Sequence, residues 1–533
     1  MHKDAYTEKL NDIINLPQFD KVVPKRKNEK HPVLKEEDRV LSLLKKLRKD
    51  NKITESLFAK LKPCGSQAPR LYGLAKIHKE NVPLRPVLSM PGSAYYKIAN
   101  QVTEWLKVVD ECNINSSTKS ISDKLKDIQL EEDEEIISFD VKSLYTNVPV
   151  KEAIHDCTEL LFSGRYQKPP VDKGTFKQLL DICSCDVIML THDGYYRQVD
   201  GLAMGSPPAP LVANGWMSKF DSKIKDNAML YSRYMDDIIR NIKRIEIKRK
   251  LAEINKYHSS LEFTIETEQN QSIPFLDMKI TRQNGKLYST WFYKTTDTGL
   301  TMNFHAIAPL RYKKSVVSGL VHRIHRACST WANFDTSLSK AKKLLEKNQY
   351  PPDFYEPIIY STLEKIVTNY EHTVSEEKPE DDKNEEKLVF VQYRGKVTEK
   401  FEHSLRKIKA PCKMIKTIKK LKTVLPSLKT PIEKALKSKV VYQINCSRCE
   451  ACYVGQTSRH LATRIKEHQK SGPVGSHMKS CNTSLTMDNV SIKTVSTRSI
   501  AHLMTLEALI IKSVKPDLNT KDEYRSRTLT IKL

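Results

Sequence analysis

The sequence predicts an α+β protein of several domains, and three observations support this fold class. The chain has 533 residues, enough for about two to four domains with a sizeable buried core. From Leu71 to Tyr293, helical periodicity mixes with short apolar runs broken by Gly, Pro and Asn-Gly, a pattern typical of helices and strands together. The run Ser375 to Lys387 is rich in Glu, Asp and Lys and poor in apolar residues, so it marks the clearest domain boundary.

The expected domains follow from these patterns in chain order. The first part is polar and Lys-rich with one amphipathic stretch, and the segment after the mixed region has apolar residues at helical spacing. The predicted divisions are a helical extension over 1–65, a mixed domain over 66–295, a helical domain over 296–370, an acidic and polar linker over 371–395, a basic connector over 396–436 and a compact unit over 437–533.

The composition favours a polyanionic partner. The formal net charge is +25, which most often accompanies nucleic-acid binding, although a solvated basic surface or an acidic membrane also fits the charge alone. The N-terminus lacks a signal peptide and no apolar run is long enough to span a bilayer, so we expect no membrane partner. We expect synthesis in the cytoplasm and a nuclear location. The 11 cysteines are then mostly buried thiols, except where they cluster at metal-ligand spacing.

Two β-prone runs carry acidic residues that are suited to metal binding. Ile136 to Val141 nearly ends on Asp140, and Tyr231 to Ile239 places Asp236 and Asp237 between β-prone flanks. An adjacent acidic pair within a core strand would bury one charge at high cost, whereas at a hairpin tip both carboxylates can converge on metal. Nucleotidyl transfer requires two such divalent ions. A solvated acidic pair and a helix N-cap remain the ordinary alternatives for either run alone.

The acidic runs resemble the catalytic strands of reverse transcriptases. Tyr234-Met235-Asp236-Asp237 is similar to their YxDD box, and Ser138-Phe139-Asp140-Val141 to their first catalytic strand. Gly201 to Pro210 resembles the glycine-rich motif that opens the helix beneath the templating base pair. The resemblance implies an RNA-directed DNA polymerase whose two Mg²⁺ ions are held by Asp140, Asp236 and Asp237, with Val141 beside Asp140 as a further ligand.

The region before the first acidic run carries a more distinctive resemblance. Arg70 to Lys79 and Pro83 to Ser89 are together similar to the fingers of Penelope-like retroelements, and Ser143 to Pro149 and Ile273 to Asp277 resemble the same family. The resemblance extends in order from about residue 65 to 330. It implies a right-hand polymerase, with fingers and palm over 66–295 and a thumb over 296–370.

The resemblance also implies roles for five substrate-binding residues. Lys76 and Arg85 would hold the incoming triphosphate, a task suited to a point charge and a guanidinium fork. Tyr145 would be the aromatic gate that excludes a ribose 2′-OH, and its alternative role is an ordinary core aromatic. Gly205 and Ser206 would let the backbone approach the nascent base pair closely.

The compact C-terminal unit contains two short strand-like runs, each with a tyrosine. Tyr442 lies in the first and Tyr453 in the second, and His468 follows Arg464 by four residues on the same helical face. Glu507 lies in an apolar helix. With Asn519, this order resembles a GIY-YIG endonuclease, the small α/β nuclease domain that Penelope-like elements carry after their polymerase. The match covers most of residues 439–525 and departs from the family name at three positions that stay β-prone: Val440, Val441 and Val454.

This second resemblance implies hydrolysis with a single metal ion. Glu507 would bind Mg²⁺, Arg464 would neutralise the scissile phosphate, and Tyr442 and Tyr453 would position or activate the water. His468 fits equally as a packed histidine, a surface histidine or a member of the site. Asn519 completes the predicted catalytic set.

Cysteines with metal-ligand spacing lie in the same unit. Cys446 and Cys449 form one Cys-x-x-Cys pair, and His477 and Cys481 are spaced as a second pair, which is the sequence mark of a structural tetrahedral Zn²⁺ site. We take these four as the ligands and Cys452 as the reserve. Ordinary buried thiols are the alternative, as is expected for Cys183 and Cys185 in a probable core helix.

The sequence thus predicts a Penelope-like reverse transcriptase with a DNA-nicking domain, acting in target-primed reverse transcription and integration. Its partners would be a template RNA (its own transcript), target DNA with a primer 3′ end, and dNTPs. One alternative is a telomerase-like or domesticated polymerase whose C-terminal unit only binds DNA. Another is a non-catalytic nucleic-acid-binding relic.

Overall fold

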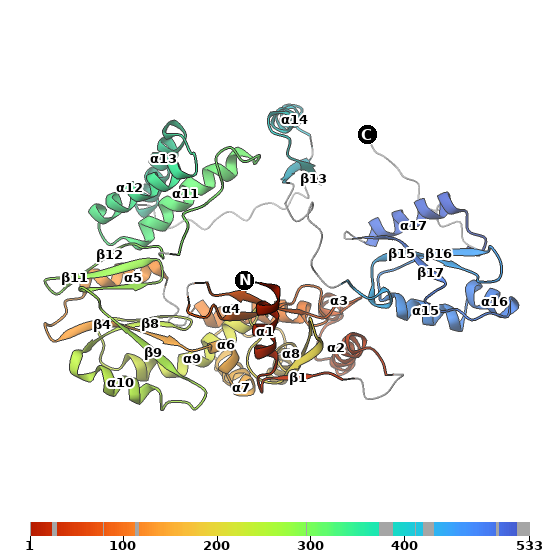
Figure 1. Cartoon of the computed structure of the whole chain (residues 1–533), viewed down its shortest axis with the longest axis horizontal. Helices are drawn as coiled ribbons and strands as arrows, with labels where there is room; N and C mark the ends of the chain where they lie inside the picture. The colour runs from red at the N-terminus through yellow and green to blue at the C-terminus, as the bar shows by residue number, and fades with distance from the viewer. Residues whose placement is uncertain are drawn as a thin grey trace. The chain divides into compact units, whose positions relative to one another are not determined.

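The structure, a computed structural model of the chain, forms two compact units (Figure 1). It describes residues 2–23, 29–77, 79–111, 117–294, 296–371, 387–410, 412–418, 431–496 and 500–519. Unit 1 comprises 1–113, 143–217 and 429–533, and unit 2 comprises 114–142 and 218–428. No helix within these described ranges is both long and apolar enough to cross a membrane.

Unit 1 contains a five-stranded sheet in the order β1-β6-β5-β2-β3. The strands are β1 (Phe19–Lys21), β2 (Arg70–Ala75), β3 (Leu84–Ser89), β5 (Val187–Thr191) and β6 (Gly194–Gln198). The helices of this part are α1 (Lys3–Ile14), α2 (Pro32–Lys49), α3 (Glu55–Leu61), α4 (Tyr96–Glu111), α6 (Leu144–Asn147), α7 (Val150–Leu161), α8 (Lys173–Ser184) and the start of α9 (Ala209–Lys225). β2 and β3 form an antiparallel hairpin, and β2 runs parallel to β5.

The N-terminal residues 1–65, expected as a helical extension, are built into this sheet domain. They supply three helices and also β1, which pairs antiparallel with β6. The buried carboxylate of Glu36 in α2 accepts a hydrogen bond from Tyr95 (2.8 Å) and pairs with Arg197 of β6 (2.6 Å). Because a buried charge is tolerated only when it is paired, this network fixes α2 against the sheet.

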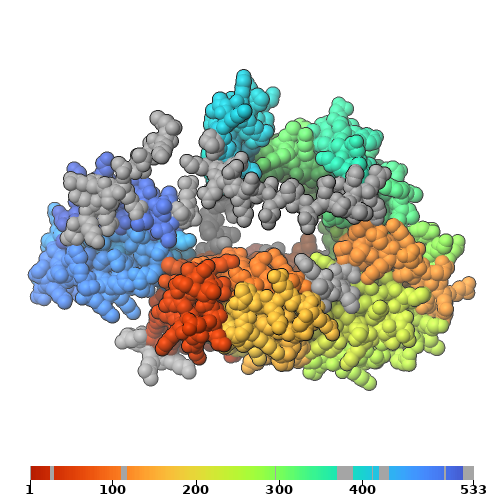
Figure 2. Space-filling model, turned by 180° about the vertical axis from the view of Figure 1, so that it is seen from behind, coloured from red at the N-terminus to blue at the C-terminus, as the bar shows by residue number. Residues whose placement is uncertain are grey.

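The N-terminal helices also pack beside α7 and α8. In Figure 2 the red surface of these helices adjoins the gold surface of residues 150–184, and Lys52 pairs with Asp172 at 3.4 Å. Asp172 also caps α8, because its carboxylate accepts a hydrogen bond from the Thr175 amide (3.0 Å). Cys183, near the end of α8, is fully buried as expected.

The C-terminal part of unit 1 is a three-stranded antiparallel sheet in the order β16-β15-β17. Its strands are β15 (Val440–Asn445), β16 (Cys452–Thr457) and β17 (Val490–Val495), and its helices are α15 (Leu461–Lys470), α16 (Pro473–Ser480) and α17 (Ile500–Val514). Alternate residues of β15 face opposite sides: Tyr442 and Ile444 join the core with α15 and α16, whereas Val441 packs with α17. The two tyrosine-bearing strands predicted here are present, and the valines that depart from the family name are buried within them.

Hydrogen bonds within unit 1 join this C-terminal part to the residues that precede β2. Ser438 Oγ donates to the Gly65 carbonyl (2.8 Å), and Gln67 Nε2 donates to the Leu436 carbonyl (2.9 Å). Gly65 has a φ of +62°, and a Cβ on it would overlap Ser438. The close approach therefore requires glycine at this position.

Unit 2 contains a four-stranded antiparallel sheet in the order β7-β8-β4-β9. Its strands are β4 (Glu134–Val141), β7 (Tyr231–Tyr234), β8 (Asp237–Lys243) and β9 (Phe263–Thr267), and α5 (Thr118–Lys124) and α10 (Ile247–Ile254) belong to the same unit. A second sheet consists of β10 (Ser272–Phe275), β11 (Met278–Gln283) and β12 (Lys286–Trp291). Asn284 and Gly285 join β11 to β12 with φ of 51° and 75°, the turn that the Asn-Gly signal predicts.

Three helices, α11 (Leu310–Ala327), α12 (Trp331–Lys347) and α13 (Pro352–Glu371), share one apolar core with the four-stranded sheet and the β10-β11-β12 sheet of unit 2. The core members include Ile136 of β4, Met278 of β11, Val321 of α11 and Phe334 of α12. The three helices lie in the segment for which helical spacing was noted, and the shared core makes them a continuation of the sheet domain.

Residues 387–417 differ from the plain linker and connector that the sequence predicts. Two strands, β13 (Lys387–Gln392) and β14 (Cys412–Thr417), pair in parallel and are connected through α14 (Lys396–Lys407), which makes a small β-α-β element. A basic stretch therefore forms regular structure, because it contains the apolar run Leu388 to Val391 in β13 and apolar residues at helical spacing in α14. The predicted acidic run Ser375 to Lys387, apart from its last residue, and the basic residues 419–430 lie outside the described residues.

Candidate active sites

The three predicted polymerase carboxylates lie together at one end of the β4–β8 pair. Asp140, the penultimate residue of β4, is in register with Asp237, the first residue of β8. Tyr234 is also in register with Asp237, so Met235 and Asp236 form the two-residue turn between β7 and β8. The arrangement is the hairpin tip beside a strand end that the sequence predicts, and all three side chains are half-buried.

The electrostatics of this site fit a divalent cation. Burial, followed by the charges of Asp236 and Asp140, raises the pKa of Asp237 to about 6, and Lys294 opposes this rise. Three carboxylates so close together repel one another in the absence of a counter-charge. Hard cations such as Mg²⁺ prefer carboxylate and carbonyl oxygens, so these groups fit such an ion. Val141 is buried in β4, where it can offer only its backbone carbonyl.

A buried ion pair that sequence reasoning missed supports the catalytic turn. Met235 has a φ of 58°, a strained value for a residue other than glycine. The fully buried Arg233 donates to the Met235 carbonyl (3.2 Å), and its Nε and Nη2 donate to the two carboxylate oxygens of Asp221 on α9 (2.7 and 2.8 Å). Tyr231 also donates to Asp221 (2.6 Å). The sequence did contain one sign of this pair: Arg233 lies inside a β-prone run, and a cation that is buried in a strand needs a partner of opposite charge.

The predicted substrate-binding residues all lie in unit 1. Arg85 is exposed on β3, opposite Leu74 of β2, and Lys76 follows β2 with its amide bonded to the Pro83 carbonyl (2.9 Å). Both predicted triphosphate ligands therefore belong to one hairpin.

The glycine-rich run packs closely on two other predicted segments of unit 1. The Leu202 amide donates to the Tyr145 carbonyl of α6 (2.6 Å). Gly205 has a φ of +107°, and a Cβ on it would overlap the Leu88 carbonyl of β3. Ser206 is buried, and its hydroxyl has no hydrogen-bond partner among the described residues. The structure thus brings Tyr145, Gly205 and the strand that bears Arg85 together, while the roles of these residues stay predictions.

The C-terminal sheet gathers the predicted nuclease residues around the fully buried phenol of Tyr442. His468 Nε2 lies 2.8 Å from the Tyr442 hydroxyl, and Arg464 Nε donates to the same oxygen (3.2 Å). Tyr453 packs edge-on against the His468 ring, with centroids 5.0 Å apart. Glu467, which sequence reasoning did not single out, accepts a hydrogen bond from Arg464 (3.1 Å) and so orients its guanidinium.

Charge and burial set the protonation states of this cluster. Burial, followed by the positive charge of Arg464, lowers the pKa of His468 to about 4. Burial raises the pKa of the Tyr442 hydroxyl, and Arg464 opposes this rise. At neutral pH the histidine is therefore neutral and the phenol protonated. The Tyr442 oxygen accepts a hydrogen bond from Arg464 and shares a second hydrogen bond with Nε2 of His468.

Gly455 has no side chain, and the phenol rings of Tyr442 and Tyr453 occupy the space that a side chain would fill. It pairs with Tyr442 across β15 and β16, and a Cβ on it would lie 2.7 Å from Cε1 of Tyr453 and 2.9 Å from the Tyr442 hydroxyl oxygen. A larger residue would displace one ring. The glycine is therefore a structural requirement of this cluster.

Glu507 and Asn519 lie at different parts of the same domain. Glu507 is buried on α17, and its charge contributes to the raised pKa of Tyr442. Asn519 accepts a hydrogen bond from the Val454 amide (2.9 Å) and donates to the Val454 carbonyl (2.8 Å). The Asn519 amide thus holds strand β16, and its predicted catalytic role stays a prediction.

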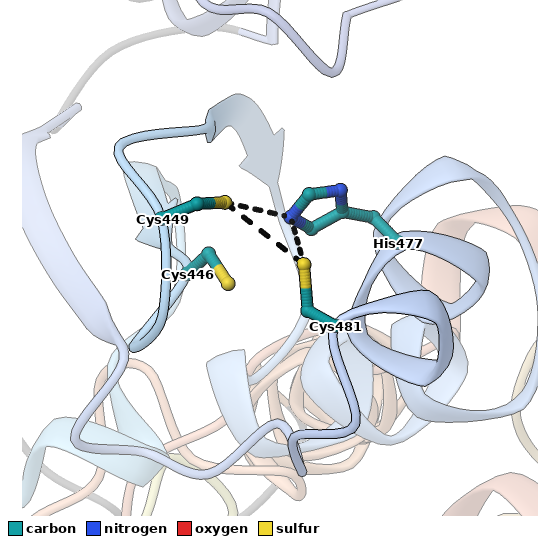
Figure 3. A group of neighbouring side chains, drawn as sticks. All are labelled: Cys446, Cys449, His477 and Cys481. Atoms are coloured by element: carbon teal, nitrogen blue, oxygen red, sulfur yellow. Dashed lines mark hydrogen bonds between the residues drawn. The ribbon is translucent and has the colours of Figure 1, made fainter.

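The four predicted zinc ligands converge near one end of the sheet (Figure 3). One donor atom from each of Cys446, Cys449, His477 and Cys481 lies within 4.8 Å of the others. Nε2 of His477 is 3.3 Å from Cys449 Sγ and 3.4 Å from Cys481 Sγ. The Arg448 amide, which donates to Cys446 Sγ, lowers the pKa of Cys446 to about 6 and so favours the thiolate that a metal binds. The reserve, Cys452, lies on β16 outside this group.

Family models match three segments of the chain. Residues 77–273 match reverse transcriptase (RNA-dependent DNA polymerase), residues 300–360 match an animal helix-turn-helix domain, and residues 438–522 match the GIY-YIG catalytic domain. Among curated proteins, none has a matching sequence. The helix-turn-helix match covers α11 and α12, the helices predicted as a thumb.

Several solved polymerase structures are weakly similar. A telomerase from Candida albicans in complex with a fragment of telomeric RNA has 11% identity and a TM-score of 0.38, over 61% of this chain and 63% of that one. A Sicinivirus RNA-dependent RNA polymerase has 12% identity and a TM-score of 0.33, over 66% and 74% of the two chains. The chain thus spans less than two thirds of the telomerase, and the domain assignment rests on the family models.

The two enzyme domains predicted from the sequence, a reverse transcriptase and a C-terminal GIY-YIG endonuclease, are confirmed. The trio of carboxylates lies within the reverse transcriptase segment, and the tyrosine cluster lies within the C-terminal GIY-YIG segment. The chain therefore contains a reverse transcriptase domain followed by a C-terminal GIY-YIG catalytic domain, an order of domains consistent with a Penelope-like element protein.

Proposed function

We propose that this protein copies RNA into DNA from a primer that its own GIY-YIG domain produces by nicking target DNA. The observation that carries the proposal is the convergence of Asp140, Asp236 and Asp237 at paired strand ends, in a chain that also holds the Tyr442 cluster. A nick exposes a 3′-OH, and primer extension requires one. The two activities therefore form consecutive steps.

In the polymerase step, the primer 3′ oxygen forms a bond to the α-phosphorus of a dNTP and pyrophosphate leaves. Mg²⁺ held by Asp140, Asp236, Asp237 and the Val141 carbonyl would neutralise the charge that develops on these oxygens. The chain itself holds the carboxylates in place. The Arg233–Asp221 pair restrains the turn that carries Asp236, so little reorganisation is needed during the reaction.

The unit 1 residues would handle the incoming nucleotide. Lys76 and Arg85 on one hairpin would bind the triphosphate, and Gly205 and Ser206 would lie close to the nascent pair because no larger side chain intervenes. Tyr145, fixed through its carbonyl to Leu202, would exclude a ribose 2′-OH.

In the nuclease step, water forms a bond to the scissile phosphorus and the P–O3′ bond breaks. Arg464, aligned by Glu467, would neutralise the phosphate. Tyr442 would orient the water, since its hydroxyl is held by hydrogen bonds to both Arg464 and the neutral His468. Glu507 would hold a Mg²⁺ ion, whose charge polarises the phosphate.

The thiol cluster fits a structural Zn²⁺ ion. Three sulfurs and one imidazole nitrogen within 4.8 Å supply the Cys₃His set that zinc accepts. None of the described cysteines forms a disulfide. The ion would connect the loop after β15 to α16 and so stabilise the nuclease domain.

The proposed partners are the protein's own transcript as template, target DNA with its primer 3′ end, and dNTPs, in the nucleus. The net charge of +25 supports polyanionic partners. The alternative is a telomerase-like or domesticated polymerase that extends existing ends.

One reaction separates these functions. Purified protein is incubated with its transcript, supercoiled plasmid, dNTPs and Mg²⁺. Nicked plasmid covalently joined to cDNA is the expected product. Extension of a supplied primer without any nicked plasmid would instead favour the alternative, and neither product would refute both.

A further inference from the structure

In the β13-α14-β14 element, helix α14 covers one face of the two-stranded sheet. Parallel pairing places Leu388 opposite Lys413 and Phe390 opposite Ile415. Met414, the residue between these two positions on β14, is buried. Since side chains alternate along a strand, Met414 marks the covered face, and Leu388 and Phe390 lie on the other.

This other face is apolar and open among the described residues. Phe390 is 68% exposed and Leu388 55% exposed, which is unusual for large apolar residues on a strand. Parallel strands are normally covered on both faces, so a two-stranded sheet of this kind is incomplete as it stands. We call the surface formed by Leu388, Phe390, Lys413 and Ile415 the open face.

The surroundings of the open face are strongly basic. Residues 387–417 contain nine Lys and Arg against two Glu. Both acids are engaged within the element, because Glu402 pairs with Lys416 (2.6 Å) and Glu399 accepts a hydrogen bond from Tyr393 (2.8 Å). The remaining positive charge is available to a polyanion. A second copy of the element would bring like charges together, which disfavours self-association through this face.

We propose that the open face binds single-stranded RNA, with a base stacked on Phe390 and the neighbouring phosphates near Lys413 and the other basic residues. An exposed aromatic ring beside cations is the combination that binds unpaired bases. A duplex cannot use it, because its bases are already stacked. This binding is separate from both active sites, and it would hold a template segment on the element that follows the polymerase domain and precedes the nuclease domain in the sequence.

The full-length chain tests the proposal by anisotropy titration without Mg²⁺ at fixed salt. The probes are a short labelled oligouridylate and an RNA–DNA duplex. Phe390→Ala should weaken binding of the oligouridylate at least about fivefold and leave duplex binding unchanged. The matched control is Val397→Ala, which truncates an equally exposed apolar residue (72%) on α14 and should change neither. Lys413→Gln should lower the slope of log affinity against log salt concentration for the oligouridylate by about one, because one phosphate contact is lost.

Photocrosslinking identifies the part of the chain that contacts the RNA. Oligouridylate that contains 5-iodouridine should crosslink to the peptide that bears Phe390. Unchanged oligouridylate affinity for Phe390→Ala, with crosslinks only outside residues 387–417, would overturn the proposal. So would a change from dimer to monomer caused by Phe390→Ala, since the face would then be a protein interface. Loss of primer extension with intact oligouridylate binding would concern the proposed polymerase function alone.

Discussion

At the scale of single residues, the carboxylate trio determines whether the polymerase domain is active. Asp140→Ala or Asp236→Ala should lower primer extension on an RNA template more than about a hundredfold, because a metal ligand is lost. RNA binding should persist, since the basic surface is unchanged. Single-turnover extension and a filter-binding assay measure the two properties. Wild-type extension by either variant would show that the palm assignment is wrong.

Tyr145 offers a test of sugar selection. Its backbone carbonyl accepts a hydrogen bond from the Leu202 amide, and truncation of the side chain does not remove that bond. Tyr145→Ala should raise ribonucleotide relative to deoxyribonucleotide incorporation at least about tenfold, because the 2′-OH no longer meets a ring. Competition between the two nucleotides on one template measures the ratio. An unchanged ratio would assign Tyr145 to the core.

His468 makes the nuclease domain sensitive to acid. Its pKa is about 4 in the folded chain against 6.5 for an ordinary histidine, so the unfolded chain takes up the proton first as pH falls. The stability that the neutral ring contributes is complete above pH 6.5 and is lost as pH falls towards 4, at up to about 1.4 kcal/mol per pH unit. His468→Gln should show a shallower loss of thermal stability between pH 6.5 and 4.5. Parallel slopes would contradict the assignment.

At the scale of elements, the β7–β8 hairpin depends on the Arg233–Asp221 pair. The pair lies behind a turn in which Met235 has positive φ, and it contacts the turn through the Met235 carbonyl. Arg233→Lys keeps the positive charge but loses the two-pronged guanidinium that binds Asp221. The carboxylates of Asp236 and Asp237 should therefore shift. Displacement of catalytic groups on this scale costs up to about a hundredfold in rate. We expect primer extension to slow by about 10- to 100-fold and to require more Mg²⁺, while template–primer affinity stays constant.

The matched control is a second buried pair in unit 2. Arg282 pairs with Glu268 (3.1 Å) away from the catalytic turn. Arg282→Lys should lower the thermal unfolding temperature to a similar extent without a change in Mg²⁺ dependence. If both variants slow extension equally, Arg233 contributes only to stability.

The sequence predicted correctly those elements that depend on the spacing of residues within a short run. The hairpin tip at Asp236 and Asp237, the tyrosine strands β15 and β16, and the four-ligand thiol cluster all follow from spacing. The β13-α14-β14 element did not, because its lysine content resembles that of a linker. Arg233 and Glu36 were also missed, since each depends on a long-range partner: Asp221 lies 12 residues from Arg233, and Tyr95 lies 59 residues from Glu36.

At the scale of the whole molecule, two chemistries share one chain, and the N-terminal part of unit 1 contacts the nuclease domain. His460 is buried, with Nε2 2.6 Å from the Ser66 carbonyl, and Ser438 donates to Gly65. These contacts lie on residues other than Tyr442 and Glu507. The two active sites should therefore be separable by substitution, although an isolated nuclease fragment would lose these contacts.

The last prediction separates the active sites and the metal in the full-length chain. Glu507→Ala should stop plasmid nicking and leave extension of a supplied primer unchanged, because Glu507 belongs to α17 and not to the reverse transcriptase segment. Cys446→Ser should instead release zinc and destabilise the nuclease domain, since structural zinc contributes on the order of 10 kcal/mol to small zinc domains. Elemental analysis should find near one zinc per wild-type chain. If it finds none while nicking persists, the thiols only pack the loop, and if Glu507→Ala also abolishes extension, the two domains work as one enzyme.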